Sequence, residues 1–449
     1  MSVSPYSQVF LSSTNYNSKS LYKKRRKAMM KELDSFCVFA GMPLDPGGEE
    51  AFSQTFTRFM QEPAFLYLTG INQAECYLLL DPRDGAEILF VPPKDPFKEF
   101  WNGKRLGYLD GDNEVSKVTG FEDVRPVDEL FETIIARAKK KPSCGHAYAY
   151  YFEKFPGDHN DQFRKEMQKA LKGTGVTLKS AASIHWKLRL PLEKERILDA
   201  RKAQAATEDA FRKVLGSMSH LTNERQLGLM LDYEMQRRSD GDLAFPTIVA
   251  GGENACCLHY VKKDEPLNKG DLVLLDFGIR MGTLHSDISR TIPVNGKFNP
   301  LQKMLYEIVL DAQTEYQKYV RPGVSLKEIG MVPWDFIMDA LESRLVKGAK
   351  GAYELLYDKR PHGVSHFIGE QIHEGSPESR SLDVVLEPGM LISCEPGLYG
   401  EFFAIIGGKK YMEKIGIRIE DDLLITKTEF DNISSNIPKS VADLERLIH

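Results

Sequence analysis

Long apolar runs, paired cysteines and an excess of positive charge are all missing from this sequence of 449 residues. No stretch approaches the roughly 18 consecutive apolar residues of a membrane-spanning helix, so we expect no membrane segment. The six cysteines are scattered without a CxxC pair, which excludes a zinc knuckle and a disulfide framework and fits a reducing cytoplasm. Lys and Arg total 59 against 64 Asp and Glu, a net charge of −5, so we expect no nucleic-acid partner bound through bulk charge.

The N-terminal segment also lacks acidic residues. Residues 1–31 contain seven basic residues, five of them in Lys23–Lys27, and no apolar run typical of a secretory signal. One interpretation is an organelle transit peptide, which has this composition. The other is a terminal segment that enters a first helix, Leu21–Leu33, with a basic face in solvent. Only two of the seven are arginines, whereas transit peptides are rich in arginine, so we favour the helix and expect a cytoplasmic protein.

What is present favours two domains. Hydrophobic residues make up 42% of the chain, enough for more than one core without a structural metal. Short apolar runs alternate with helical patterns up to Pro191, which predicts a smaller α/β domain over residues 1–190. The predicted strands of this domain are Ser35–Ala40, Cys76–Leu80 and Ile88–Val91, and the predicted helices are Val127–Lys140 and Asn160–Leu171.

The second half, residues 191–449, changes from helices to strands, back to helices and again to strands. That order within one unit predicts an α+β domain with a mostly antiparallel sheet. It begins with an amphipathic helix, Leu192–Leu215, in which Ala203, Ala206, Ala210 and Val214 share one face. The other predicted helices are Glu224–Arg238, capped by Thr222, Pro300–Tyr319 and Ser325–Leu345, the last kinked near Pro333. The predicted strands are Phe245–Ala250, Cys256–Val261, Leu272–Ile279, Leu284–Pro293, Met390–Glu395 and Ile415–Thr426.

Four acidic residues lie in or beside the apolar strands of this half. Because an isolated buried carboxylate is costly, each of them needs a partner or a metal. Asp276 and Asp287 oppose each other if the hairpin turns between Met281 and Gly282, with Cβ atoms about 5 Å apart. Two divalent ions would turn their repulsion into coordination. Alternatively, one aspartate caps the turn and the other is solvated.

The other two acids are Glu395 and Glu420. Glu395 ends a strand before a Pro-Gly turn, and Glu420 closes the run Ile415–Glu420. With a period of two, the isoleucines of that run point one way while Arg418 and Glu420 point the other. This polar face either lines a site or is a solvated Arg–Glu pair.

Histidines concentrate in the same region. Five of the ten lie between residues 259 and 373, and His362, His366 and His373 fall within 12 residues. Their spacing would suit one helical face, but Gly363 and Gly369 favour a loop or strand. Any one of them alone is more often structural. Three beside acidic strands indicate a metal or proton-transfer site.

Together these residues favour a two-metal hydrolase. The set is rich in carboxylates, contains imidazole and lacks thiolate, which suits Mn²⁺, or Co²⁺ or Zn²⁺. A bridging water or hydroxide would be the nucleophile. A glutamate can act as its base, and histidines can stabilise the oxyanion and donate to the leaving group.

At this point the sequence resembles a known family, the pita-bread metallopeptidases, in their Xaa-Pro aminopeptidase (aminopeptidase P) and prolidase branch. The resemblance covers about residues 190–449 through six stretches in order, and the first domain more loosely. The six stretches are Asn254–Tyr260, Leu274–Gly278, Ser286–Thr291, Pro361–Gly369, Leu386–Tyr399 and Gly416–Asp421, and the looser matches are Arg25-Arg26 and Phe65–Ile71.

The resemblance implies a C-terminal pita-bread catalytic domain with a curved sheet, and it implies roles for individual residues. Asp287 and Glu420 would bridge two metals, and Glu395 would also be the general base. The implied metal ligands are Asp276, Asp287, His366, Glu395 and Glu420; the implied substrate and transition-state histidines are His259, His362 and His373; Tyr399 and Arg418 match the rim of the site. The chain departs from the family where Gln371-Ile-His-Glu374 replaces the usual Asp-Val-His-Asp, so rim contacts there are expected to differ.

The resemblance also implies a function. We expect a dinuclear Xaa-Pro aminopeptidase acting on proline-containing peptides, most simply with Mn²⁺, and forming a homodimer or homotetramer. Prolidase, which takes only dipeptides, stays open because the residues that bind a free carboxylate cannot be located. A binding module and a metal-free hydrolase of this fold are disfavoured because all five ligand positions are filled. A methionine aminopeptidase would lack a comparable first domain.

Overall fold

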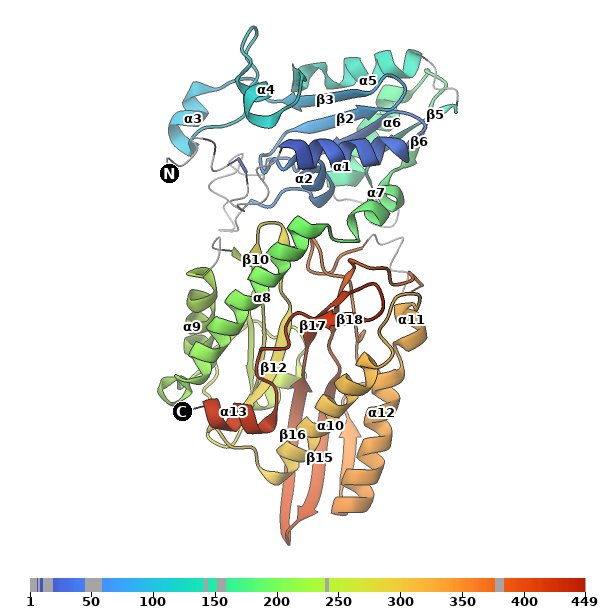
Figure 1. The fold of residues 1–449 in the computed structure, drawn as a ribbon. Helices are drawn as coiled ribbons and strands as arrows, with labels where there is room; N and C mark the ends of the chain where they lie inside the picture. The colour runs from blue at the N-terminus through green and yellow to red at the C-terminus, as the bar shows by residue number, and fades with distance from the viewer. Residues whose placement is uncertain are drawn as a thin grey trace. The chain divides into compact units, whose positions relative to one another are not determined.

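The computed structural model describes residues 6, 9–10, 19–44, 59–140, 144–151, 159–238, 242–375 and 383–448. The chain forms two compact units, one of Met1–Arg189 with Gly375–Arg380 and one of Leu190–Glu374 with Ser381–His449 (Figure 1). The division falls one residue before the predicted boundary. Among the described residues, none of the helices combines the length and apolarity needed to cross a membrane.

The first unit contains a six-stranded mixed sheet, in agreement with the predicted α/β class. The strand order is β4-β3-β2-β1-β5-β6, with β1 antiparallel to β2 and parallel to β5. The strands are β1 Cys37–Ala40, β2 Tyr77–Asp81, β3 Ala86–Val91, β4 Asp123–Pro126, β5 His146–Ala149 and β6 Thr177–Ser180.

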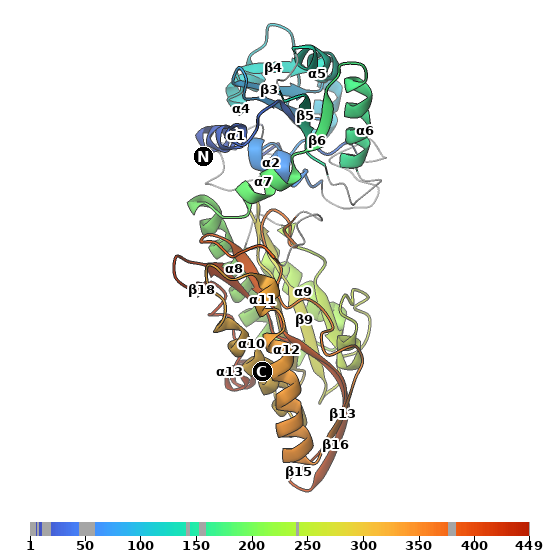
Figure 2. The ribbon, with the colours of Figure 1, turned by 90° about the vertical axis from the view of Figure 1, so that its right-hand side faces the viewer.

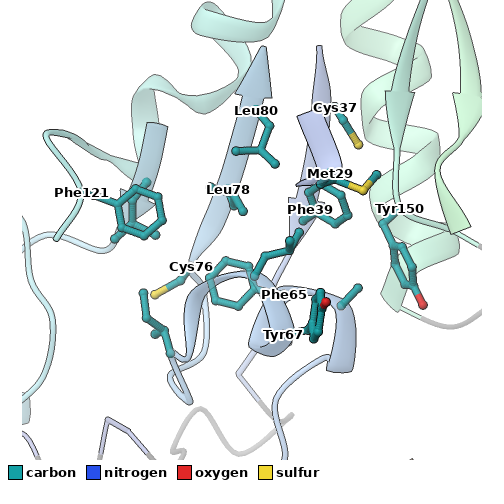
Figure 3. Close-up of a cluster of buried hydrophobic side chains, with 14 of the residues drawn as sticks. Met29, Cys37, Phe39, Phe65, Tyr67, Cys76, Leu78, Leu80, Phe121 and Tyr150 are labelled. Carbon is teal, nitrogen blue, oxygen red and sulfur yellow. The ribbon is translucent and has the colours of Figure 1, made fainter. Parts of the chain in front are cut away.

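The central strands of this sheet are buried on both faces, and their successive residues enter different cores. Phe39 and Leu78 face a core that helices α1 and α2 complete (Figure 3), whereas Val38 and Leu79 face a core completed by α5 and α6. The helices are α1 Lys19–Lys31, α2 Pro63–Thr69, α3 Pro96–Asn102, α4 Glu114–Thr119, α5 Leu130–Lys139, α6 His159–Leu171 and α7 Ala182–Arg189, with a 3₁₀ turn η1 Val127–Glu129 before α5.

Helix α1 differs from the predicted solvated basic face. Its lysines are exposed, but Arg25 and Arg26 are buried. Arg25 donates to the Tyr67 carbonyl oxygen at 2.9 Å and stacks on the Tyr67 ring, and Arg26 pairs with Glu87 at 2.7 Å. Two of the basic residues are therefore part of the packing of the first unit.

The second unit combines helices with antiparallel sheets, in agreement with the predicted α+β class. Every strand pairing described in it is antiparallel, and the long β15–β16 ribbon is curved (Figure 2). The strands are β7 Asp242–Leu243, β8 Ile248–Gly251, β9 Leu272–Phe277, β10 Ile279–Met281, β11 Leu284–His285, β12 Ile288–Pro293, β13 Ala352–Leu355, β14 Leu391–Cys394, β15 Gly397–Ile406, β16 Lys409–Arg418, β17 Asp421–Ile425 and β18 Phe430–Asn432.

The helices of this unit lie against its sheets. Helix α8 packs on β10 and β11 through the predicted face of Ala203, Ala206, Ala210 and Val214, all of which are buried, and α10 packs on β15 and β16. The helices are α8 Lys194–Leu215, α9 Glu224–Gln236, α10 Pro300–Gln317, α11 Leu326–Ile329, α12 Val332–Ala340 and α13 Val441–Leu447, with 3₁₀ turns η2 Met218–His220 and η3 Gly252–Cys256 and a π-helical segment η4 Leu341–Gly348.

Three local predictions are corrected or refined by the structure. Cys256–Val261 is not a strand, because η3 and a turn occupy that segment. The cap of α9 is Asn223 rather than Thr222, since its side chain accepts the Gln226 amide. The expected kink near Pro333 is a break between α11 and α12, with the proline in the first turn of α12, where its missing N–H is tolerated.

Candidate metal centre

The hairpin that carries the two aspartates turns one residue later than predicted. Met281 pairs with Leu284, so the turn residues are Gly282 and Thr283, and Gly282 has a φ of 60°. Asp276 therefore lies opposite Ser289 rather than opposite Asp287. The prediction of direct opposition was wrong because the positive φ that a glycine supplies is needed at the first turn residue.

The two aspartates nevertheless meet. Asp287 precedes Ser289 by two residues, so it reaches the same side of the hairpin as a diagonal neighbour of Asp276. Glu420 joins them from the short link between β16 and β17, and one carboxylate oxygen from each of the three lies within 4.8 Å of the others. Asp287 and Glu420 are 5% and 2% exposed, which excludes a solvated Arg–Glu face at this position.

Buried polar groups fix the link that carries Glu420. Arg290, fully buried, donates to the Glu420 carbonyl oxygen and pairs with Asp421 at 2.8 Å. Ser289 Oγ donates to Glu420 Oε2 at 2.7 Å and accepts a bond from Arg418 at 2.8 Å. The carboxylate thus faces Asp276 and Asp287 in one orientation.

His366 approaches the same point from a loop, as the flanking glycines predicted. Its Nδ1 lies 3.1 Å from the Phe367 carbonyl oxygen, which can only accept, so Nδ1 donates and the backbone fixes the orientation of the ring. Nε2 lies 3.4 Å from Asp287 and 3.5 Å from Glu395. A histidine held through one nitrogen with the other facing carboxylates has the arrangement of a metal ligand.

Glu395 is positioned by the strand that precedes it. Its amide donates to the Val364 carbonyl oxygen at 2.9 Å, and the Ser393 amide donates to the His366 carbonyl oxygen at the same distance. Ser393 Oγ lies 3.3 Å from Glu395 Oε1 and accepts the His366 amide. The backbone of β14 therefore brings Glu395 and His366 together.

The electrostatics of this cluster favour a bound cation. Burial, followed by the neighbouring carboxylates, raises the pKa of Asp287 and of Glu420 well above the usual range, and burial raises that of Glu395 although His366 opposes the shift. Asp276 Oδ2 accepts a bond from Arg418 at 2.6 Å, but its buried Oδ1 accepts none from the described residues. Four carboxylates and one imidazole, with one orphaned oxygen, fit two divalent ions.

A chain of hydrogen bonds runs from this cluster to the histidine predicted to act on the substrate. Arg418 donates to Asp276 and, at 3.0 Å, to the Tyr399 hydroxyl. Since that oxygen accepts from Arg418, its proton is free to point at His362 Nε2, 3.2 Å away. Burial, with Arg418 next, lowers the pKa of His362 to about 4, so the ring is neutral at physiological pH.

His362 is fully engaged in this arrangement. Its Nδ1 lies 2.8 Å from the Gly363 carbonyl oxygen, its Nε2 faces Tyr399, and the ring contacts Trp334 edge-on with centroids 5.2 Å apart. Donation to a substrate therefore requires that one of the two hydrogen bonds be given up.

The other two predicted histidines lie at the edge of the cluster and are exposed. The ring centroid of His373 is 4.1 Å from that of His366, and one of its nitrogens lies within 4.8 Å of ligand atoms of Asp287 and His366. His259 follows η3 and is close enough to His362 to contribute, after burial and Arg418, to its lowered pKa.

Four supporting residues were not anticipated from the sequence. Ser289, Ser393 and Arg290 orient ligands, and Trp334 packs on His362. The period of two along a strand would have found Ser289, which follows Asp287 by two residues, and Ser393, which precedes Glu395 by two. Nothing in the sequence pattern marks Arg290 or Trp334, because their contacts are made far along the chain.

Comparison with protein families gives matches to both units. The family model described as metallopeptidase family M24 matches residues 199–427. The model described as aminopeptidase P, N-terminal domain, matches residues 22–144. The resemblance seen in the sequence is thus confirmed for both halves of the chain.

Individual relatives give the same result. Xaa-Pro aminopeptidase 3 of Rattus norvegicus is 31% identical over 397 residues, covering 87% of this chain and 76% of that protein. Xaa-Pro aminopeptidase of Escherichia coli is 28% identical, covering 96% and 98%. Among solved structures, proline aminopeptidase P II from Yersinia pestis has a TM-score of 0.80 at 27% identity, covering 96% and 99%. Zinc-substituted E. coli aminopeptidase P with product has a TM-score of 0.78 at 26% identity, covering 96% and 98%.

Proposed function

The chain belongs to metallopeptidase family M24, and from this premise we propose that it is a dinuclear Xaa-Pro aminopeptidase, which hydrolyses the bond between an N-terminal residue and a following proline. The observation that carries the proposal is the meeting of four carboxylates and one imidazole, with an orphaned Asp276 oxygen, in a chain whose relatives bear that name.

The ligands we assign are the five side chains of the cluster. Asp287 and Glu420 would help to hold both cations, since their carboxylates face those of the other ligands. When bound, the cations supply positive charge for the developing oxyanion and lower the pKa of a water molecule. The complete set is Asp276, Asp287, His366, Glu395 and Glu420.

We assign Glu395 as the general base as well as a ligand. Its raised pKa means that it holds a proton more readily than an ordinary carboxylate, which suits a base that must take one from water. Ser393 restrains one of its oxygens, and the other faces His362 Nδ1 at 3.7 Å.

The histidines and the rim residues are assigned to the substrate. Neutral His362 donates an N–H to the carbonyl oxygen of the scissile bond, after exchanging one of its present bonds. Arg418 and Tyr399 hold that ring ready, and the exposed His259 and His373 contact the substrate from the open side of the cluster.

Three finer properties follow as proposals. Mn²⁺ is the first choice of cation because the ligand set is rich in oxygen, with Co²⁺ and Zn²⁺ as substitutes. We propose a homo-oligomer, a dimer or tetramer. We also propose a cytoplasmic location, because removing residues 1–31 as a transit peptide would delete Arg26, which pairs with Glu87, and the buried Met29.

A paired assay tests the function. Xaa-Pro dipeptides and longer Xaa-Pro-Yaa peptides are incubated with the Mn²⁺-loaded protein, with Xaa-Ala-Yaa as the control. We expect release of the first residue from the longer proline peptide and little from the alanine peptide. Cleavage of dipeptides alone would indicate a prolidase, and cleavage of neither would remove the proposal.

A further inference from the structure

A second group of metal-ligating side chains lies in the first unit, in the sheet that carries none of the active-site ligands. Asp34, Cys144 and His146 each present one ligand atom, and these three atoms lie within 4.8 Å of one another. They meet because β1 and β5 are parallel neighbours, so the segments entering both strands lie at the same edge of the sheet.

One nitrogen of His146 is held by the backbone, and the other faces a carboxylate. Nδ1 lies 3.0 Å from the Cys144 carbonyl oxygen, which can only accept, so Nδ1 carries a proton. Nε2 then faces the Asp34 carboxylate at 2.9 Å and the Tyr148 hydroxyl at 3.1 Å. A cation would replace the hydrogen bond between Nε2 and Asp34, while the bond from Nδ1 to the backbone carbonyl oxygen keeps the ring oriented, as such a bond does in metal-ligating histidines.

The other two ligands are also suited to a cation. Asp34 presents a carboxylate oxygen at the surface, and Cys144 presents its Sγ 3.9 Å from the Asp34 carbonyl oxygen, so both side chains reach the same point beside His146.

We propose that Asp34, Cys144 and His146 form a binding site for one borderline divalent cation of the Zn²⁺ class. A thiolate, an imidazole and a carboxylate are three of the donors that zinc takes. In a tetrahedral zinc site with bonds of about 2.0–2.3 Å the ligand atoms lie roughly 3.3–3.8 Å apart, so side-chain rotations that move these atoms by about 1 Å would bring all three to one ion. The Asp34 side chain is 57% exposed, which leaves room for a water as fourth ligand.

This site is independent of the proposed peptidase activity, and its chemistry makes it separable. The ligands assigned to the active site contain no cysteine, so a thiolate-to-cobalt charge-transfer band in the near ultraviolet cannot arise from them. Co²⁺ titration of the full-length, chelated and dialysed protein is therefore the experiment. We expect such a band to saturate with one Co²⁺ per chain and to disappear when Zn²⁺ is added.

Variants assign the band. Cys144→Ser is expected to abolish it, whereas Cys257→Ser, at an exposed cysteine of the second unit, is the matched control and should retain it. Asp34→Asn, also exposed, should weaken Co²⁺ binding at this site at least about tenfold, the lower end of the loss seen when a supporting group is removed. Circular dichroism checks that each variant is folded.

Three results would overturn the proposal: no band in the parent protein, a band that survives Cys144→Ser, or Co²⁺ affinity unchanged in Asp34→Asn. In the first case His146 and Asp34 form an ion pair only. Peptide hydrolysis should be the same in Cys144→Ser and in the parent, so failure of the peptidase proposal would not be mistaken for failure of this one.

Discussion

Asp81 in the first unit and Asp287 in the second are both buried carboxylates, yet their surroundings are opposite. Asp81 accepts bonds from Arg83 at 2.6 Å and Arg137 at 2.9 Å. Asp287 instead faces Asp276 and Glu420. Around Asp81 the protein neutralises the acid with its own arginines, whereas around Asp287 it gathers acids that repel one another. We therefore expect a bound cation to stabilise the fold around Asp287 but not around Asp81.

Asp276 shows both arrangements in one side chain. Oδ2 accepts a bond from Arg418, while Oδ1 is buried and has no hydrogen-bond partner among the described residues. One oxygen is therefore satisfied by the protein and the other is left for a ligand.

Removing divalent cations should have the largest effect. Chelation followed by dialysis is expected to abolish hydrolysis of an Xaa-Pro-Yaa peptide, and Mn²⁺ or Co²⁺ should restore it. Hydrogen exchange should rise around Asp287 and Glu420 but not around β1–β3, since only the second unit depends on the cations for charge balance. Full activity in a sample verified to be metal-free would contradict both the metal dependence of hydrolysis and the dependence of the second unit on the cations.

Substitution of single ligands comes next. Asp287→Ala should lose metal, because it removes a buried carboxylate that would help to hold both cations. Glu395→Gln should lower turnover by about 10²- to 10⁴-fold through loss of the base. Asp443→Asn, an exposed acid of the same unit paired with Arg446, is the control and should change neither. Near-normal turnover of Glu395→Gln with two metals bound would show that the base lies elsewhere.

Loss of His362 should have a smaller effect on turnover than loss of a metal ligand, and it should leave the metals in place. A transition-state donor of this kind contributes about 2.7–4 kcal/mol, so His362→Ala should lower turnover by roughly 10²- to 10³-fold at unchanged metal content and melting temperature. His220→Ala, an exposed histidine of the same unit, serves as the control. A collapse of metal content or stability, or barely altered turnover, would remove His362 from the mechanism.

The sequence predicted the composition of the site better than its geometry. Acidic residues in apolar strands and glycine-flanked histidines were enough to indicate a metal site, because burying such groups without a partner is costly. The predicted register of the hairpin was wrong by one residue. Both Met281–Gly282 and Gly282–Thr283 contain a glycine, so either pair could have formed the turn. The supporting bonds of Arg290 and Trp334 depend on contacts between distant segments, which local patterns do not contain.

The same distinction between local patterns and distant contacts applies to the predictions of the fold. Long helices with a clear apolar stripe, such as α8, were predicted nearly to their ends. The apolar run Cys256–Val261 was mistaken for a strand because composition alone cannot tell a short strand from a 3₁₀ turn packed on a sheet. Arg25 and Arg26 were placed in solvent because their partners, Tyr67 and Glu87, lie far along the chain.

Substitution of Asp81, which arginines of the first unit neutralise, should affect stability but not catalysis. Asp81→Asn removes charged hydrogen bonds and should destabilise the first unit by about 1.5–3 kcal/mol. Asp84→Asn changes a half-exposed acid paired with the same Arg137 and should cost less, about 0–1 kcal/mol. Denaturant unfolding measures both, and metal content and turnover of the folded protein should match the parent. A lower metal content in Asp81→Asn would show that the contrast between the units is false.

In the metal-free protein, acidification should change the stability of the two units differently, although the change is small. The pKa of Asp81 is lowered, because the hydrogen bonds from Arg83 and then Arg137 outweigh the opposing effect of burial. Its contribution is therefore complete above its unfolded pKa of about 3.9 and is lost only as pH falls through the folded value. Asp287 and Glu420 have raised pKa values, so protons bind the folded state more tightly and stability falls as pH rises through them.

Between pH 7 and pH 5 protonation of Asp287 and Glu420 should therefore stabilise the metal-free second unit, against the opposing effect of His285 and His362, whose pKa values are lowered to about 4, while Asp81 contributes no change in the first unit. Each 1 kcal/mol gained should raise the midpoint of the second unit by about 2–4 °C. In the metal-loaded protein the sign should reverse, because protons then compete with the cations for the same carboxylates. Hydrogen exchange of peptides from each unit, at both pH values and with and without Mn²⁺, measures all four cases. If both units responded equally, or if the sign were the same with and without metal, the buried acids of the second unit would not have raised pKa values in the folded protein.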